Sequence, residues 1–348
     1  MSSCSFFTRC VRDRSSSKIP ITLKSLLALG VVLLPTALRA ANPIITDAFT
    51  ADPAPLVVGD TVYLYCGQDE APNDRWSYVM NRWLCYSSKD MRTWKPEGSP
   101  LKPTDFTWAT GAAWASQVVE RNGKFYWYVA VEHERSHRGK AIGVAVSDSP
   151  TGPFKDARGT ALVTNEMTTA TRIGYDDIDP TVFIDNDGQA WLFWGNQKCY
   201  YAKLKPNMIE LDGAIQVIPD AQVPGYTEAP WLHKRNGLYY LSYATGFPEK
   251  LSYSTATRIT GPWTPRGLLA EGAFNSNTSH EGIITFKGVD YMVYHNGSMQ
   301  FRSKLGAGCS VRRSVCVDYL YYNPDGSIRR VLETTEGTDL PPAKFPVR

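Results

Sequence analysis

Five segments of this 348-residue chain share one pattern: an apolar strand, a tight turn that contains glycine, and a second strand rich in aromatic residues. A short glycine turn between two such strands is typical of a β-hairpin. The turn glycines follow one another at intervals of 64, 65, 49 and 51 residues and are Gly59, Gly123, Gly188, Gly237 and Gly288. The intervals leave room for further strands between the hairpins.

A third strand follows three of the hairpins, in the stretches that begin at Tyr86, Val146 and Tyr253. No long run of apolar residues repeats at the spacing of a helix. Five units of several strands each predict an all-β fold, a five-bladed β-propeller. A β-sandwich is the alternative, but it would not explain five similar hairpins at such long spacing.

The first 41 residues read as a signal peptide. Cations and serines precede an apolar run, SLLALGVVLLPTA from Ser25 to Ala37, and the small residues Ala40 and Ala41 follow it. The run is too short to span a bilayer comfortably, although an uncleaved anchor stays open as an alternative. We therefore expect a signal peptide at 1–41, a single catalytic domain at 42–348, and a secreted or periplasmic protein.

The formal charge of +3 comes from this leader. Residues 1–40 hold six of the 37 Lys and Arg residues and one of the 34 Asp and Glu residues, so the remaining chain has 31 against 33. A mature chain of charge −2 does not indicate a nucleic-acid partner, and no other stretch indicates a membrane. Of seven cysteines, five lie beyond the leader, and their spacing is not that of a zinc site.

Residues at equivalent positions before the hairpins should meet at the propeller axis, because the innermost strand of each blade lines the central channel. Counting back seven to nine residues from each turn glycine reaches Asp52, Trp114, Asp179, Glu228 and His280. An acid beside a proline is often only a turn residue. Three acids at one structural position, together with a tryptophan and a histidine, instead indicate a shared site.

Carboxylates grouped in a pocket with aromatic walls suit glycoside hydrolysis. One acid protonates the leaving oxygen, and another activates water or attacks the sugar. Like charges raise one another's pKa, so one carboxyl can stay protonated near neutral pH while another stays ionised.

From about Asn42 to about Val331 the sequence resembles glycoside hydrolase family 43, in the stretches ANPIITDAFTADP, GYDDIDPTVF, GYTEAPWLHKRNGLYYLSYA and SVRRSVCVDYLYYNPDGSI. The resemblance implies an inverting five-bladed propeller with Asp52 as general base and Glu228 as general acid. Asp179 is implied to raise the pKa of the acid and to orient it. Inversion needs room for water, so the Asp52 and Glu228 carboxyls should lie roughly 6.5–9.5 Å apart.

The resemblance also implies substrate-binding residues. Arg313 matches an arginine that approaches the sugar hydroxyls, although the neighbouring Arg312 leaves the register open by one residue. Trp114 and Trp108 are candidates for stacking on a sugar face, with core packing as the alternative. The polar stretch from Gln68 to Trp83 is expected to form a rim loop that shapes specificity.

His280 matches a histidine that contacts calcium in many relatives, so we expect no required cofactor and a structural calcium ion at most. One departure concerns the second blade, where many members have Trp-Ala-Pro and this chain has Trp114-Ala115-Ser116. The departure weakens assignment to a subgroup.

The sequence thus predicts a glycosidase of the α-L-arabinofuranosidase or β-xylosidase type, which releases arabinofuranosyl or xylosyl units from plant polysaccharides or oligosaccharides. The alternatives are an endo-acting arabinanase, a galactosidase or galactofuranosidase of the same fold, and a non-catalytic propeller lectin. A retaining hydrolase related to invertases would need an opening motif that this chain lacks. We expect a carbohydrate as the partner, and a monomer or a small homo-oligomer.

Overall fold

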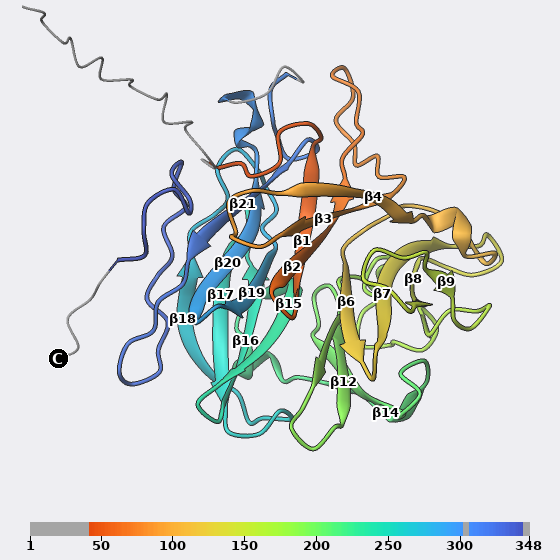
Figure 1. Ribbon diagram of the computed structural model, residues 1–348. Helices are drawn as coiled ribbons and strands as arrows, with labels where there is room; N and C mark the ends of the chain where they lie inside the picture. The colour runs from red at the N-terminus through yellow and green to blue at the C-terminus, as the bar shows by residue number, and fades with distance from the viewer. Residues whose placement is uncertain (1–41, 302–305, 344–348) are drawn as a thin grey trace, which may run out of the picture. The chain divides into compact units, whose positions relative to one another are not determined.

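The computed structural model describes residues 42–301 and 306–343, which fold into five antiparallel sheets (Figure 1). The expected signal peptide, 1–41, lies outside the described residues. Each sheet is one blade, and each contains one of the five predicted hairpins. The five-bladed β-propeller is confirmed.

The strands follow the chain blade by blade. Blade 1 contains β1 (Thr50–Val58), β2 (Thr61–Gln68), β3 (Trp83–Ser88) and β4 (Lys95–Leu101). Blade 2 contains β5 (Ala109–Gly111), β6 (Ser116–Arg121), β7 (Lys124–His133), β8 (Lys140–Ser147), β9 (Lys155–Asp156) and β10 (Val163–Thr164). Blade 3 contains β11 (Thr181–Ile184), β12 (Ala190–Trp194), β13 (Tyr200–Leu204) and β14 (Leu211–Val217). Blade 4 contains β15 (Tyr226–Arg235), β16 (Leu238–Thr245), β17 (Lys250–Ala256) and β18 (Thr264–Ala270), and blade 5 contains β19 (Glu281–Phe286), β20 (Val289–Asn296) and β21 (Ser314–Tyr319).

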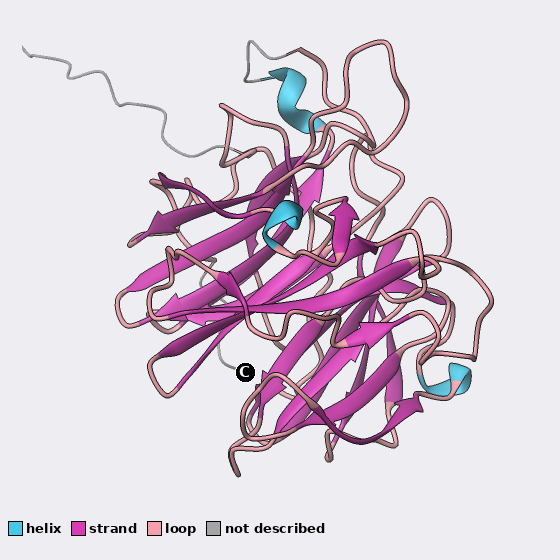
Figure 2. Cartoon of the chain, turned by 90° about the vertical axis from the view of Figure 1, so that its right-hand side faces the viewer, coloured by secondary structure: helices cyan, strands magenta, loops and turns pink. Residues whose placement is uncertain are grey.

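Helix is confined to three short 3-10 turns in the described ranges, η1 (Pro103–Asp105), η2 (Asp220–Gln222) and η3 (Ser298–Phe301) (Figure 2). None of them is long and apolar enough to cross a membrane. The predicted third strands at Tyr86, Val146 and Tyr253 are β3, β8 and β17.

The hairpin turns depend on their glycines. All five turn glycines adopt φ between +59° and +83°, a left-handed conformation that costs glycine little because it has no Cβ. This is why the repeat is visible in the sequence as regularly placed glycines.

The inner strands β1, β6, β11, β15 and β19 form a closed ring in which each contacts the inner strand of the blade before and the blade after it. The ring is closed by the first described residues, which run beside β21 of the last blade. There the Ile44 amide donates to the Val315 carbonyl, and the Thr50 amide donates to the Arg313 carbonyl, both at 2.9 Å. Blade 5 therefore takes its outer edge from the segment that leads into blade 1.

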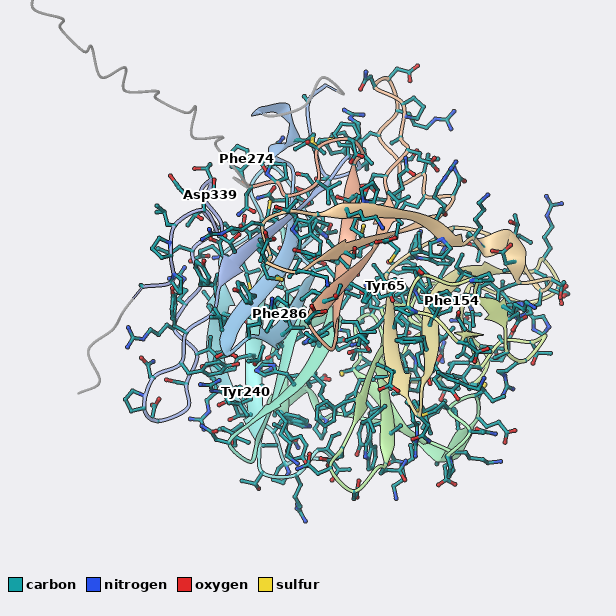
Figure 3. All side chains as sticks on the ribbon, in the orientation of Figure 1. Tyr65, Phe154, Tyr240, Phe274, Phe286 and Asp339 are labelled. Atoms are coloured by element: carbon teal, nitrogen blue, oxygen red, sulfur yellow. The ribbon has the colours of Figure 1, made fainter. Side chains whose placement is uncertain are left out.

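Apolar side chains fill each space between neighbouring blades, so the core is divided into five clusters. The cluster between blades 1 and 2 contains Tyr65 and Phe154, both labelled in Figure 3. A smaller cluster of Ala71, Cys309 and Val311 joins the loop after β2 to the segment before β21. The five cysteines of the described residues are all free and buried. Packing between blades, without disulfides, thus holds the ring that positions the axial residues.

Candidate active site

A cavity of about 180 Å³ opens where the inner strands begin. All five residues expected at the axis line it, and Arg313 joins them: Asp52, Trp114, Asp179, Glu228, His280 and Arg313. Tyr78, Met80, Ala115, Tyr175, Ile178, Asn196 and Thr278 complete its wall. The cavity is therefore formed by residues from all five blades.

Left-handed backbone and β-bulges direct the acids into the cavity. The pairing of β1 with β2 shifts register between Ala51 and Ala54, and that of β15 with β16 shifts between Glu228 and Trp231. Such bulges re-aim a side chain that regular pairing would point elsewhere. Three residues beside the acids have φ between +53° and +58°, and each precedes a proline, in Asp52-Pro53, Asp179-Pro180 and Ala229-Pro230. A bulge interrupts the hydrogen bonds between the strands and would leave a backbone N–H without a partner. Proline has no N–H, so it fits this position, which accounts for the acid-and-proline pattern in the sequence.

Asp52 is held ionised by its neighbours. Its Oδ1 accepts from Arg313 Nη1 at 2.9 Å, and its backbone N–H donates to His295 Nδ1 at 3.1 Å. Burial would raise the pKa of Asp52, but Arg313 and His295 outweigh burial and hold the pKa well below its usual range. His295 Nδ1 also lies 3.2 Å from Asp52 Oδ1, and His295 Nε2 lies 3.0 Å from the Thr278 carbonyl.

Arg313 is fixed in turn by Asp69, a residue that the sequence did not single out. Arg313 Nε and Nη2 donate to the two carboxylate oxygens of Asp69 at 2.9 and 3.0 Å, a bidentate pair buried from solvent. The Tyr78 ring centre lies 5.0 Å from the guanidinium. Arg312 instead donates to the Ala307 and Pro72 carbonyls outside the cavity. The structure thus places Arg313, rather than Arg312, at the site.

Glu228 is in the opposite electrostatic state. Its Oε2 accepts from Asn196 Nδ2 at 2.6 Å. Burial raises the pKa of Glu228 to about 7, and the charge of Asp52 adds to the rise. Near neutral pH this carboxyl can therefore carry a proton while Asp52 does not.

Asp179 lies beside Glu228 and accepts from the Ala229 amide through Oδ2 at 2.9 Å. Burial raises its pKa well above the usual range, and the Glu228 and Asp52 charges raise it further. Burial and Asp52 account for the raised pKa of Glu228, so the role that the resemblance implies for Asp179 in raising it stays a prediction.

His280 contacts two of the acids only loosely. Its Nδ1 lies 3.9 Å from Asp52 Oδ1 and 4.0 Å from Asp179 Oδ2, and burial lowers its pKa to about 4, so the ring is neutral. Calcium favours six to eight oxygen ligands. In the described part of the chain, His280 belongs to no compact group of three potential metal ligands. A calcium ion here would need mostly water ligands, and we assign it no step of the reaction.

The two candidate stacking residues differ in position. Trp114 lines the cavity, and Lys140 Nζ lies 3.9 Å from the centre of its ring. Trp108 does not line the cavity, because it packs in the core between blades 1 and 2 and donates from Nε1 to Asp156 at 3.0 Å. The expectation that Trp108 stacks on a sugar is therefore corrected: the alternative, core packing, holds.

A larger hollow of about 590 Å³ adjoins the cavity and shares Tyr78, Tyr175, Asn196, Glu228 and Thr278 with it. Its outer wall carries Trp76 and Phe247, which are 69% and 73% exposed. Trp76 and Tyr78 belong to the predicted rim loop, which thus lines both spaces. Glu228 lies at the junction of the two.

Sequence reasoning missed several residues of the site: Asp69, Tyr78, Tyr175, Asn196 and His295. Two of them carried a signal, because Asp69 and Asn196 each come one or two residues after the second strand of a hairpin, β2 and β12. Polar residues at that position point toward the same end of the ring as the acids.

The family model for glycosyl hydrolases family 43 matches residues 40–328. The chain belongs to this family. Family 43 membership makes it a glycosidase with a carbohydrate substrate and no organic cofactor, and agrees with the propeller seen here.

Relatives within family 43 cover most of the chain. A β-D-galactofuranosidase from Aspergillus niger is 31% identical, over 86% of this chain and 87% of its own. The solved α-L-arabinofuranosidase from Clostridium thermocellum is 34% identical with a TM-score of 0.69, over 84% of this chain and 97% of its own. A β-xylosidase/α-arabinofuranosidase from a compost metagenome was solved with xylotriose in a calcium-free form. It is 27% identical with a TM-score of 0.72, over 84% of this chain and 97% of its own.

Proposed function

We propose that this protein is an inverting glycoside hydrolase that releases arabinofuranosyl or xylosyl units from plant polysaccharides or oligosaccharides. Asp52 is the general base, Glu228 the general acid, and Asp179 the third carboxyl that orients the acid and the sugar. The observation that carries the proposal is the opposite state of the two acids in one cavity, with the pKa of Asp52 held low by Arg313 and that of Glu228 raised to about 7 by burial.

In this proposal the reaction is a single displacement. Ionised Asp52 takes a proton from a water molecule, whose oxygen attacks the anomeric carbon of a sugar in the inner cavity. The bond from that carbon to the glycosidic oxygen breaks, and Glu228 gives this oxygen its proton. Because Glu228 lies where the cavity meets the outer hollow, the leaving group would occupy the hollow.

The size of the inner cavity supports removal of one sugar at a time. Its volume of about 180 Å³ is below the roughly 300–1,000 Å³ of sites for drug-sized ligands, and it suits one sugar ring. Arabinofuranosyl and xylosyl substrates follow from the relatives named arabinofuranosidase and xylosidase. A galactofuranosyl substrate is the second candidate, because the Aspergillus relative is named a galactofuranosidase.

Activity on a panel of aryl glycosides and of arabino- and xylo-oligosaccharides tests the proposal. Asp52→Ala and Glu228→Ala should each lower kcat/KM by about 10²–10⁴-fold, whereas Asp60→Ala in the exposed first hairpin turn should match the wild type. Unchanged turnover in both cavity variants would overturn the roles given to the two acids. Preference for aryl galactofuranosides would select the second candidate.

We also propose that residues 1–41 direct export and are removed, leaving a secreted or periplasmic protein without membrane attachment. The apolar run that ends at Ala37 and the small residues after it support this. Amino-terminal sequencing of the exported protein tests it, with a new terminus near residue 42 expected and retention of the leader contradicting it.

A structural calcium ion at His280, and a monomer or small homo-oligomer, complete the proposal. Calcium removal by a chelator should lower the melting temperature without abolishing turnover. Loss of turnover at unchanged stability would contradict a structural role. Light scattering measures the oligomeric state, and a large assembly would contradict it.

A further inference from the structure

Three potential metal ligands meet at the end of β7 in blade 2. His133 ends β7, and Glu134 and His137 follow it in the turn toward β8. Their ligand atoms all lie within 4.8 Å of one another. None of the three lines the cavity or the outer hollow.

The backbone of the turn brings the two histidines together. The His137 amide donates to the Glu134 carbonyl at 2.9 Å, and the Glu134 amide donates to the Trp108 carbonyl at 3.0 Å. The imidazole centres are consequently 4.2 Å apart. The letters HERSH match a motif that binds zinc when it lies on a helix, but here a turn, rather than a helical repeat, makes the juxtaposition.

A second observation points to a ligand. His133 is only 7% exposed, and its Nδ1 is buried with no hydrogen-bond partner. Buried imidazole nitrogens normally have a partner, so one without a partner beside two other ligands is suited to a metal.

We propose that His133, Glu134 and His137 bind one divalent transition metal ion of the zinc class. Two imidazoles and a carboxylate are a ligand set that zinc favours. Tetrahedral zinc with bonds of 2.0–2.1 Å holds its ligand atoms about 3.3 Å apart. The Glu134 and His137 side chains are 49% and 43% exposed, so both have room to close that difference.

The ion would also connect two loops. Glu166 comes from the segment after β10, and its Oε1 lies 3.4 Å from His137 Nδ1. It also accepts from the Arg138 amide at 3.4 Å, while the Lys140 amide donates to the Gly174 carbonyl at 2.8 Å. Tyr175, which lines the catalytic cavity, is the next residue after Gly174. With Glu166 as a fourth ligand, a bound metal would hold the turn at 134–139 against the segment that carries Tyr175.

Zinc titration of the full, untagged chain after chelation and dialysis tests the site, by calorimetry and by thermal unfolding. We expect one zinc per chain and a raised melting temperature. Glu134→Gln and His137→Ala, both at exposed positions, should bind zinc roughly tenfold or more weakly, and Arg135→Ala in the same turn should bind as the wild type. No binding by the wild type, or equal binding by the double variant Glu134→Gln/His137→Ala, would overturn the site.

Amide hydrogen exchange tests the connection between the loops. Zinc should slow exchange at 134–139 and at 165–174 in the wild type, and in neither segment of the double variant. Slowing confined to 134–139 would overturn the part assigned to Glu166. If Glu166 is the fourth ligand, the variant Glu166→Gln should retain zinc binding but lose the protection from exchange at 165–174.

Discussion

Arg313 Nη1 donates to Asp52 Oδ1 at 2.9 Å, while the rest of the same guanidinium is clamped on Asp69. One buried cation therefore pairs with two acids of blade 1, of which Asp52 lines the cavity and Asp69 does not. Arg313 lowers the pKa of Asp52 through this contact. For Glu228, burial and the Asp52 charge raise the pKa and outweigh the more distant Arg313. The division between base and acid thus depends on the placement of one arginine.

The pH dependence of kcat/KM should have an alkaline limb only. Glu228 must be protonated, so kcat/KM should fall about tenfold per pH unit above its pKa of about 7. Asp52 must be ionised, and its pKa is held well below the usual range, so kcat/KM should stay level down to about pH 4. Initial rates at low substrate measure this profile, with circular dichroism to verify folding. An acid limb near pH 5 in the folded enzyme would contradict the state assigned to Asp52.

Arg313→Lys should create that missing acid limb. Lysine keeps the charge but cannot donate to Asp52 and hold Asp69 bidentately at once, so the pKa of Asp52 should rise. Each unit by which this pKa exceeds the working pH lowers the ionised fraction about tenfold. The measurement is the pH profile of the variant beside Arg312→Lys, which changes the neighbouring arginine outside the cavity. Identical profiles in the two variants would show that Arg313 does not tune the base.

Glu281 should make the protein less stable as pH rises. It is fully buried on β19, neither oxygen has a hydrogen-bond partner, and burial raises its pKa to about 8. In the unfolded chain it ionises near 4.5, so between about pH 4.5 and 8 folding must keep a proton that the unfolded chain releases. This lowers the free energy of unfolding by up to about 1.4 kcal/mol per pH unit.

Glu281→Gln should remove this slope, so the variant should gain stability relative to the wild type as pH rises from about 5 to 8. Denaturant unfolding at several pH values measures the difference. Glu120→Gln, at an exposed position on β6, serves as the control and should show no such trend. A constant difference between Glu281→Gln and the wild type would mean that Glu281 is ionised in the folded protein.

Trp76 and Phe247 should matter for long substrates only. Both are exposed on the wall of the outer hollow, where the leaving group is proposed to lie. An aromatic contact contributes about 0.5–1.5 kcal/mol, so each alanine variant should lower kcat/KM on oligosaccharides roughly 2- to 12-fold. Small aryl glycosides should be unaffected. Leu332→Ala, equally exposed but outside the hollow, is the control, and equal losses on both substrate classes would contradict a role in leaving-group binding.

The sequence predicted the ring because its determinants are local. Each turn glycine needs a left-handed φ, and the residues that face the axis lie seven to nine positions before it, so Asp52, Asp179 and Glu228 could be placed at one axis by counting. Their meeting in one cavity is what the structure shows. Their roles stay predictions until the variants are measured.

Other parts of the site were beyond such counting. Asp69 reaches Arg313 across 244 positions of the chain, and His295 reaches Asp52 across 243, so both depend on how the ring closes. The sequence around Trp108 does not distinguish a ring that binds sugar from a ring that packs in the core. Only the path of the chain after β4 shows that its ring turns into the core.

Proton NMR of the first-formed sugar tests the central claim most directly. The claim is that one cavity holds an ionised Asp52 and a protonated Glu228 on opposite sides of the bond that breaks. With an aryl β-xyloside as substrate, we predict that α-xylose appears first and that the β-anomer follows only by mutarotation; with an aryl α-L-arabinofuranoside, the β-anomer should appear first. First formation of the anomer that matches the substrate would mean retention of configuration and would contradict the single displacement.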